Sequence, residues 1–204
     1  MTAAPSTLSI RDRTAECSDR ECKLLSYSAV RVIAIHRLHL RGVDIADDHL
    51  DAPTMCREFQ ANPKLSRYTG KQNPYALLIR AREGMIEQCT PLLEMGAHAG
   101  VWNDDAIGIA VVGDFRTEHP TSQQWHRAML LAATLSQAFE ARILGHDELA
   151  GGSRDKAKEC PGRLFPMPAF RAQIRDLIRN NRGDLGTPAA AHNLLARAGA
   201  RYGG

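Results

Sequence analysis

Short apolar runs and helical patterns alternate along the chain. Residues 30–35 (VRVIAI) are β-branched and nearly continuous in their apolarity, as expected of a strand buried on both faces. Comparable runs bounded by Gly, Pro or charged residues predict four further strands, near residues 76–80, 85–88, 107–112 and 143–145. The first two of these four are separated by Arg-Glu-Gly, which predicts a hairpin. The pattern therefore predicts a central sheet.

Helical periodicity appears between and after these runs. Thr121 and Gln124 have the spacing of a capping box, and the apolar stripe that follows predicts a helix over residues 122–141. A second stripe predicts a helix over residues 168–181, and a short helix is expected over residues 52–60. Together the elements predict an α/β fold, in which a single domain has a mixed central sheet flanked by α-helices.

The composition changes at both ends of the chain. Residues 1–27 are polar and weakly periodic, which predicts an N-terminal arm or a loosely packed helix. Residues 183–204 are dominated by Gly, Ala and scattered Arg, which predicts a flexible basic tail. The domain itself is expected over residues 28–182, and a chain of 204 residues is long enough for one sizeable core.

The formal net charge of +3 favours no particular partner. Beyond residue 162 there are seven arginines and two aspartates, a net charge of +5, so the rest of the chain is slightly acidic. A basic tail could contact an anionic surface, although a solvated helix face is the commoner meaning. No run reaches the roughly 18 apolar residues that a membrane-spanning helix needs.

A histidine and a cysteine bracket a loop rich in Gly, Ser and Lys. His146 and Cys160 are soft ligands that one flexible loop could fold onto a metal ion, and a catalytic zinc site needs a third protein ligand and an open position. His36, at the end of the strand predicted over residues 30–35, is the best candidate. The alternative is that His146 ends a strand, Cys160 is a small buried hydrophobe and His36 is an isolated histidine.

Other features of the sequence are weaker evidence for a metal site. The chain has five cysteines, an odd number, so at least one thiol is unpaired within it, which suits a thiolate on zinc. Four aspartates between residues 44 and 51 lack the spacing of a calcium loop and favour a solvated turn with helix-starting charges. The P-C-x-x-C motif of the zinc nucleobase deaminases is absent.

Four sequence blocks resemble the zinc-dependent N-acetylmuramoyl-L-alanine amidases, the family shared by bacteriophage endolysins and animal peptidoglycan recognition proteins. They lie at residues 34–42, 73–92, 96–115 and 143–164. In the third block, Gly-Ala-His-Ala followed by Asn and Ile-Gly-Ile is specific enough to make chance a poor explanation. The resemblance implies the peptidoglycan recognition protein fold and a Zn²⁺ ion held by His36, His146 and Cys160.

The same resemblance implies roles for four more residues. Tyr75 matches a tyrosine that hydrogen-bonds the zinc-bound water or the oxyanion, and Lys158 matches a lysine that stabilises the oxyanion; both are therefore expected to be catalytic. His98 and Asn103 match positions that line the groove for the muramyl peptide. The alternatives are an aromatic residue at a strand start, a solvated loop lysine, and an asparagine that fixes its own loop.

The chain departs from the family pattern at three positions. Arg37 stands where the family often has a second His or a Cys, and Ala76 where His is common. One branch of the family has a glutamate, the usual general base of such a zinc site, where this chain has Ala110. Tyr75 and Lys158 are therefore the preferred catalytic pair.

The expected function is zinc-dependent hydrolysis of the amide bond between N-acetylmuramic acid and L-alanine in peptidoglycan, as a phage-type endolysin. The alternative is a non-catalytic peptidoglycan-binding protein of the same fold; Cys160 argues against it, because members that have lost catalysis commonly lack this ligand. We expect a monomer whose partner is peptidoglycan rather than nucleic acid. No signal peptide is visible at the start, so synthesis in the cytoplasm and another route to the cell wall are expected.

Overall fold

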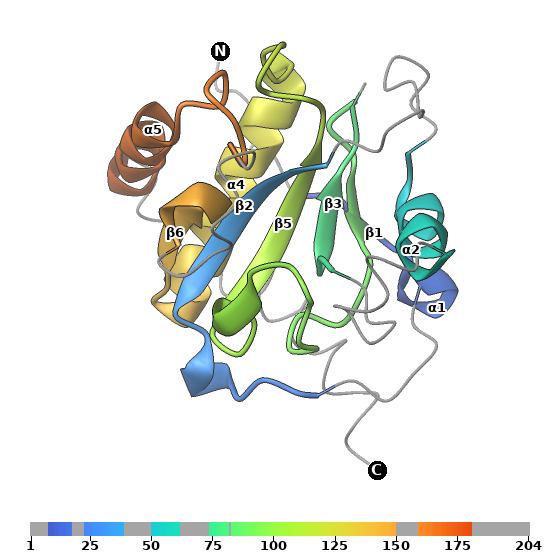
Figure 1. The fold of residues 1–204 in the computed structure, drawn as a ribbon. Coiled ribbons are helices and arrows are strands. Elements are labelled where there is room, and N and C mark those ends of the chain that lie inside the picture. Colours follow the sequence, from blue (N-terminus) through green and yellow to red (C-terminus); the bar gives the residue numbers. More distant parts are fainter. Residues whose placement is uncertain are drawn as a thin grey trace.

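A six-stranded mixed sheet forms the centre of the protein (Figure 1). The computed structural model describes residues 8–17, 23–38, 50–61, 74–81, 83–149 and 159–180. The strands, in the spatial order β1-β4-β3-β5-β2-β6, are β1 Ile10–Asp12, β4 Ile86–Gln88, β3 Leu77–Ile79, β5 Ala106–Val112, β2 Val32–Leu38 and β6 Arg142–Gly145. Among the pairs that these six described strands form, only the β3–β4 hairpin is antiparallel. The predicted mixed sheet is confirmed.

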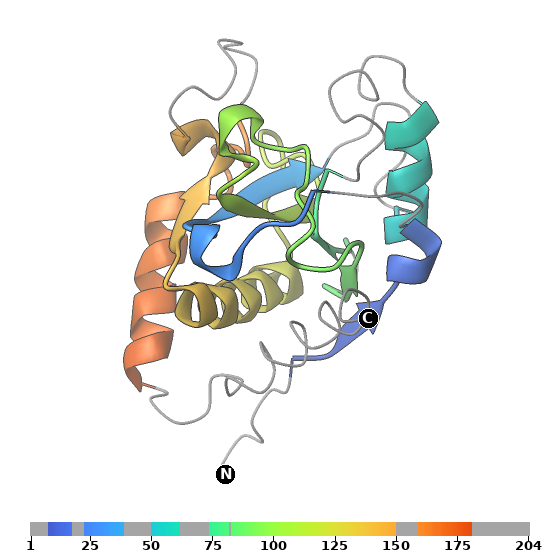
Figure 2. The same cartoon turned by 90° about the horizontal axis from the view of Figure 1, so that it is seen from below.

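Helices cover the sheet unequally. They are α1 Thr14–Cys17, α2 Ala52–Ala61, α4 Ser122–Phe139 and α5 Met167–Asn180, with the short 3-10 helices η1 Tyr27–Ala29, η3 Gly100–Trp102 and η4 His146–Glu148. Seen from below, α4 lies on one side of the sheet and η3 and η4 lie on the other (Figure 2). The predicted α/β fold is confirmed. Among the described residues, no helix has the length and apolarity to cross a membrane.

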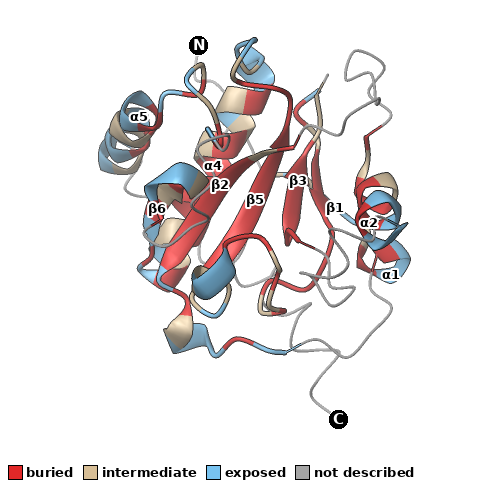
Figure 3. Cartoon of the chain, in the orientation of Figure 1, coloured by how far each residue is buried: buried red, intermediate tan, exposed pale blue. Residues whose placement is uncertain are grey.

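Strand β5 shows why the two sides of the sheet differ. Its sequence AIGIAVV alternates β-branched and small residues, and successive side chains of a strand point to opposite faces. Ile107, Ile109 and Val111 join the large apolar cluster under α4. Ala106 and Ala110, on the opposite face, belong to two smaller clusters. All seven residues of β5 are buried (Figure 3), so the small residues create space for other side chains rather than for solvent.

The capping box predicted for α4 is present and also ties the helix to the sheet. The Thr121 hydroxyl accepts from the Gln124 amide at 3.1 Å, and the Gln124 side chain accepts from the Thr121 amide at 3.0 Å. The Gln124 side-chain amide then donates to the Val112 carbonyl at 2.7 Å, at the end of β5. The helix is therefore fixed at the edge where β2 and β5 end.

The segment predicted as an N-terminal arm contributes to the sheet. Strand β1 pairs in parallel with β4, and Cys17 in α1 is buried against α2. Periodicity does not detect β1 because it is three residues long and two of them are exposed. Residues 1–7, 18–22 and 183–204 lie outside the described residues, so the predicted tail and the domain limits stay predictions.

The face under α4 should supply most of the stability. Leu131 is fully buried there, and we expect Leu131→Ala to lower the free energy of unfolding by about 3 kcal/mol, through lost apolar contact and the cavity left behind. Urea unfolding followed by circular dichroism measures the change. Leu24→Ala is the control. Because Leu24 is 45% exposed, this substitution should change the free energy of unfolding by no more than about 0.5 kcal/mol. Equal costs for the two variants would contradict this assignment of the core.

Candidate metal centre

His36 is carried by the interior of the sheet. It lies near the end of β2, which runs between β5 and β6, and it is opposite Ala110 on β5. Because Ile33 and Ile35 point into the cluster under α4, His36 points to the other face. Its side chain is 1% exposed. A polar ring this deeply buried needs partners for both of its nitrogens.

His146 and Cys160 complete a group of three metal-ligand side chains around His36. His146 directly follows β6, whose Gly145 is opposite Ile35 of β2. The ligand atoms of the three residues all lie within 4.8 Å of one another, and Nδ1 of His36 is 3.8 Å from Sγ of Cys160. Tetrahedral zinc bonds to nitrogen and sulfur would separate those two atoms by about 3.6 Å. The donor set and its spacing therefore fit zinc, and no second group of this kind occurs within the described part of the chain.

Burial sets the protonation of these side chains. Desolvation, with the nearby His98 and His146, holds the pKa of His36 well below its usual value, so its imidazole is neutral and can bind a metal ion. Burial also lowers the pKa of His98 to about 4. The pKa of the Tyr75 phenol is raised by burial and then by the Cys160 thiol, so the phenol keeps its proton. The centre thus combines neutral nitrogen donors with a protonated hydroxyl.

Tyr75 lies at the side of the metal-ligand group. It precedes β3, and its ring centroid is 5.0 Å from that of His36. Phe59 of α2 packs edge-on against it with a centroid distance of 6.1 Å. The hairpin strand and α2 therefore hold the phenol beside the three ligands, where the sequence predicts a catalytic tyrosine.

His98 and Asn103 lie in the loop that covers the small-residue face of β5. The Asn103 side-chain oxygen accepts from the amides of His98 at 3.0 Å and Ala99 at 2.7 Å, so Asn103 fixes its own loop, which was one of its two interpretations. His98 contacts His36 directly: its Nδ1 is 3.0 Å from Nε2 of His36. Sequence reasoning did not find this contact. The predicted groove contacts of both residues stay predictions.

The backbone of the Cys160 loop is held from two sides. The Asp147 amide donates to the Cys160 carbonyl at 2.8 Å, which joins the loop to η4. On the other side, the Arg37 guanidinium donates to the Glu159 carbonyl. Arg37 is one of the three positions where the chain departs from the family pattern. In this protein the arginine anchors the residue before the cysteine, a role that the departure alone did not reveal.

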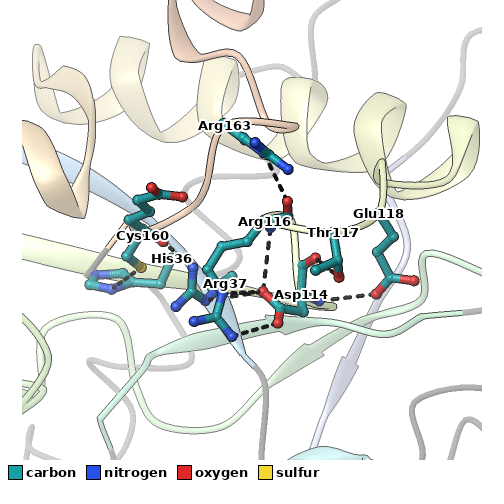
Figure 4. Close-up of polar contacts among 9 residues, drawn as sticks. His36, Arg37, Asp114, Arg116, Thr117, Glu118, Cys160 and Arg163 are labelled. Atoms are coloured by element: carbon teal, nitrogen blue, oxygen red, sulfur yellow. Dashed lines mark hydrogen bonds and ion pairs between the residues drawn. The ribbon is translucent and has the colours of Figure 1, made fainter. Parts of the chain in front are cut away.

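Asp114 supports Arg37 from the end of β5. Its carboxylate accepts hydrogen bonds from Nε and Nη2 of Arg116 at 2.7 and 2.6 Å. Nε of Arg37 lies 3.8 Å from Oδ1 of the same carboxylate (Figure 4). These guanidinium groups, Arg116 above all, lower the pKa of Asp114 to about 2. Arg163 then donates to the Arg116 carbonyl at 3.0 Å. Ion pairs and hydrogen bonds of these arginine side chains therefore connect the ends of β2 and β5 to the loop that bears Cys160.

Of the remaining predicted features, the structure describes Asp51 but not Lys158. Lys158 lies outside the described residues, so its proposed role stays a prediction. Asp51 accepts the Thr54 amide at 2.9 Å at the start of α2, which agrees with a helix-starting carboxylate. The other three aspartates of that segment also lie outside the described residues.

Comparison with known proteins places the chain among peptidoglycan-related proteins. The family described as N-acetylmuramoyl-L-alanine amidase matches residues 26–163. Peptidoglycan-recognition protein LB of Drosophila melanogaster is 38% identical over 84 residues, which are 41% of this chain and 35% of that protein. The match thus spans about a third of the relative's length.

Solved structures of the same kind are similar over most of the chain. N-acetylmuramoyl-L-alanine amidase LysC from Clostridium intestinale has a TM-score of 0.61 at 24% identity, and the match covers 83% of this chain and 99% of the LysC chain. Drosophila PGRP-LB has a TM-score of 0.58 at 27% identity, covering 80% and 94%. A mutant of PGRP-LB in complex with tracheal cytotoxin has a TM-score of 0.58 at 24% identity, covering 76% and 89%. These likenesses show a shared fold.

The ionised Asp114 should contribute stability that depends on pH. We expect Asp114→Asn to lower the free energy of unfolding at pH 7 by about 1 kcal/mol. Because the folded-state pKa of about 2 is below the unfolded value of about 3.9, the contribution is complete above the unfolded pKa and is lost as pH falls through the folded pKa. Urea unfolding of the wild type and of Asp114→Asn should therefore show a smaller difference in the free energy of unfolding at pH 3 than at pH 7. A difference that stays constant would mean that the ionised carboxylate contributes nothing.

Proposed function

The chain belongs to the N-acetylmuramoyl-L-alanine amidase family, and we propose that it hydrolyses the amide bond between N-acetylmuramic acid and L-alanine in peptidoglycan, in the manner of a phage-type endolysin. The observation that carries the proposal is the convergence of His36, His146 and Cys160 on one point, with their ligand atoms within 4.8 Å of one another. Two imidazoles and a thiolate are the donor set of a catalytic zinc site that keeps one position open.

Amide hydrolysis at neutral pH needs an activated water and a stabilised oxyanion. A zinc ion held by the three side chains would supply Lewis acidity, which polarises the scissile carbonyl and brings the pKa of water toward about 7. Water adds to the carbonyl carbon, the carbon–nitrogen bond breaks, and the nitrogen leaves with a proton as the free amino group of L-alanine. The protein must hold the carbonyl oxygen and manage that proton.

Tyr75 is suited to hold the carbonyl oxygen. Its phenol keeps its proton because burial raises its pKa, so it can donate a hydrogen bond to an oxygen on which negative charge develops. Its ring lies 5.0 Å from that of His36, centroid to centroid, which supports a place beside the reacting carbonyl. Lys158, two residues before Cys160, would add positive charge for the same oxyanion. No glutamate is available on β5, where Ala110 lies opposite His36.

A peptidoglycan-binding protein without catalysis is the second candidate, because the name of peptidoglycan-recognition protein LB, to which part of the chain is similar, describes recognition. The structure of a PGRP-LB mutant in complex with tracheal cytotoxin supports peptidoglycan fragments as the ligand class for both candidates. The complete ligand group supports hydrolysis over binding alone. Incubating the purified protein with peptidoglycan, with and without a chelator, and counting new L-alanine amino termini separates the two candidates. Hydrolysis requires new termini that the chelator abolishes.

Cys160→Ser should remove zinc and activity together. A serine hydroxyl stays protonated near neutral pH and is a poor zinc ligand, whereas zinc itself drives deprotonation of a thiol. We expect the variant to lose bound zinc, measured by atomic emission, and to release no L-alanine amino termini, while its circular dichroism spectrum is retained. Cys17→Ser, which changes another buried thiol, should keep both properties. Full activity of Cys160→Ser in metal-free buffer would rule out the mechanism.

Tyr75→Phe should separate catalysis from metal binding. Loss of one oxyanion donor typically lowers kcat by about 10²–10³-fold, and zinc content should not change because Tyr75 is not a ligand. Release of alanine amino termini from a soluble muramyl peptide gives kcat, and atomic emission gives the zinc content. Tyr27→Phe is the matched control, since its hydroxyl bonds the Ala138 carbonyl away from the centre. An unchanged kcat for Tyr75→Phe would exclude its catalytic role.

A further inference from the structure

The Ala106 carbonyl and the imidazole rings of His98 and His36 form one hydrogen-bonded row that ends at the metal-ligand group. The Ala106 carbonyl at the start of β5 lies 3.3 Å from Nε2 of His98. Nδ1 of His98 lies 3.0 Å from Nε2 of His36. Nδ1 of His36, the remaining nitrogen of the row, lies 3.8 Å from Sγ of Cys160 and belongs to the ligand group. The two imidazole rings meet at 89°, edge to face.

The carbonyl at one end of this row decides where every proton lies. A carbonyl oxygen can only accept, so Nε2 of His98 must carry the proton that it donates to Ala106. In a neutral imidazole the other nitrogen then has a lone pair, so Nδ1 of His98 accepts, and Nε2 of His36 must be the donor. This leaves Nδ1 of His36 without a proton. The metal-facing nitrogen is therefore the one that has a free lone pair.

The ring of His98 is fixed in a close-fitting cradle. A Cβ added at Gly108 would come within 3.0 Å of the His98 ring carbons, and one added at Gly96 would come within 2.9 Å of its Cδ2. Gly108 lies on β5 between Ala106 and Ala110, so the small residues of this strand make room for the imidazole. The Asn103 side chain holds the His98 amide as well. The cradle restricts the ring independently of its hydrogen bonds.

We propose that His98 is a positioning residue that holds His36 in the tautomer protonated at Nε2, and so presents a bare Nδ1 to the metal ion. His98 acts on the reaction through His36. The inference rests on the zinc site of the proposed function, but its geometry comes from contacts present without any ion. An imidazole ligand oriented in this way by a partner on its second nitrogen binds metal more tightly, because neither its orientation nor its tautomer must change.

The tautomer can be measured in the wild-type protein without metal. In a ¹⁵N-labelled sample at pH 7.5, long-range ¹H–¹⁵N correlation spectra distinguish protonated from bare imidazole nitrogens. We expect His36 to be neutral with the proton on Nε2, and His98 to be neutral with the proton on Nε2. A proton on Nδ1 of His36 would overturn the proposal. This measurement needs no substitution, so it decides the question even if a variant fails to fold.

Zinc affinity tests the consequence for the site. In His98→Asn, the side-chain oxygen is an acceptor near the position of Nδ1, although the asparagine side chain does not reach the Ala106 carbonyl. In His98→Leu, the side chain is of similar size and has no acceptor. We expect His98→Leu to bind zinc about 10- to 100-fold more weakly than the wild type in competition with a chromophoric chelator, and His98→Asn to recover most of that loss. His126→Leu, at an exposed position of α4, is the control for loss of a histidine and should bind as the wild type does.

The outcomes separate this inference from the proposed function. Wild-type affinity in His98→Leu, or an equal loss in His98→Asn and His98→Leu, would show that the ring only fills space, and would overturn the positioning role. Absence of zinc binding in the wild type would instead contradict the proposed function, and the tautomer measurement on the metal-free protein would still decide the inference. Thermal unfolding of each metal-free variant identifies any loss of affinity that comes from loss of structure.

Discussion

The deep burial of His36 is the constraint on which the rest of the centre depends. An imidazole that is 1% exposed cannot leave either nitrogen without a partner at low cost. One nitrogen is satisfied by His98, and the other faces Cys160 in the ligand group. The small residues of β5 follow from this requirement, because His98 can reach His36 only where the sheet has no bulky side chains. A strand rich in large β-branched residues on both faces would exclude it.

The sheet therefore divides its two faces between stability and chemistry. Under α4, the isoleucines of β2 and β5 pack against a continuous apolar cluster that owes nothing to the metal-ligand group. On the opposite face, the same strands carry Ala, Gly and His, and the loop that bears His98 packs against them. This arrangement differs from that of a small zinc finger, where the ion replaces a missing core. Here the apolar core under α4 forms without an ion, so the zinc proposed for this protein would not be needed to hold the fold together.

Much of the fold could be predicted because it depends on local periodicity. The stripe of α4, the runs that form β2 and β5, and the hairpin of β3 and β4 all follow from residue spacing. Strand β1 could not be found in this way, since three residues show no period and their pairing with β4 depends on a segment more than seventy residues away. The three candidate ligand residues could be proposed from the sequence because His and Cys are recognisable donors, and the structure brings their ligand atoms within 4.8 Å of one another. Their supporting contacts were not, because any residue type able to donate or accept could have made them.

Arg37 illustrates what decides those supporting contacts. It is paired with Val111 in the register of β2 and β5, and Asp114 lies just past the end of the same strand, so parallel pairing brings the two side chains to one edge. From there the guanidinium reaches the Glu159 carbonyl, and the Asp147 amide holds the next carbonyl, that of Cys160. The His36 ring is fixed by His98 and the Cys160 backbone by these two bonds. These contacts orient the candidate ligand atoms without an ion, so the zinc binding proposed for this site would lose little free energy to ordering it.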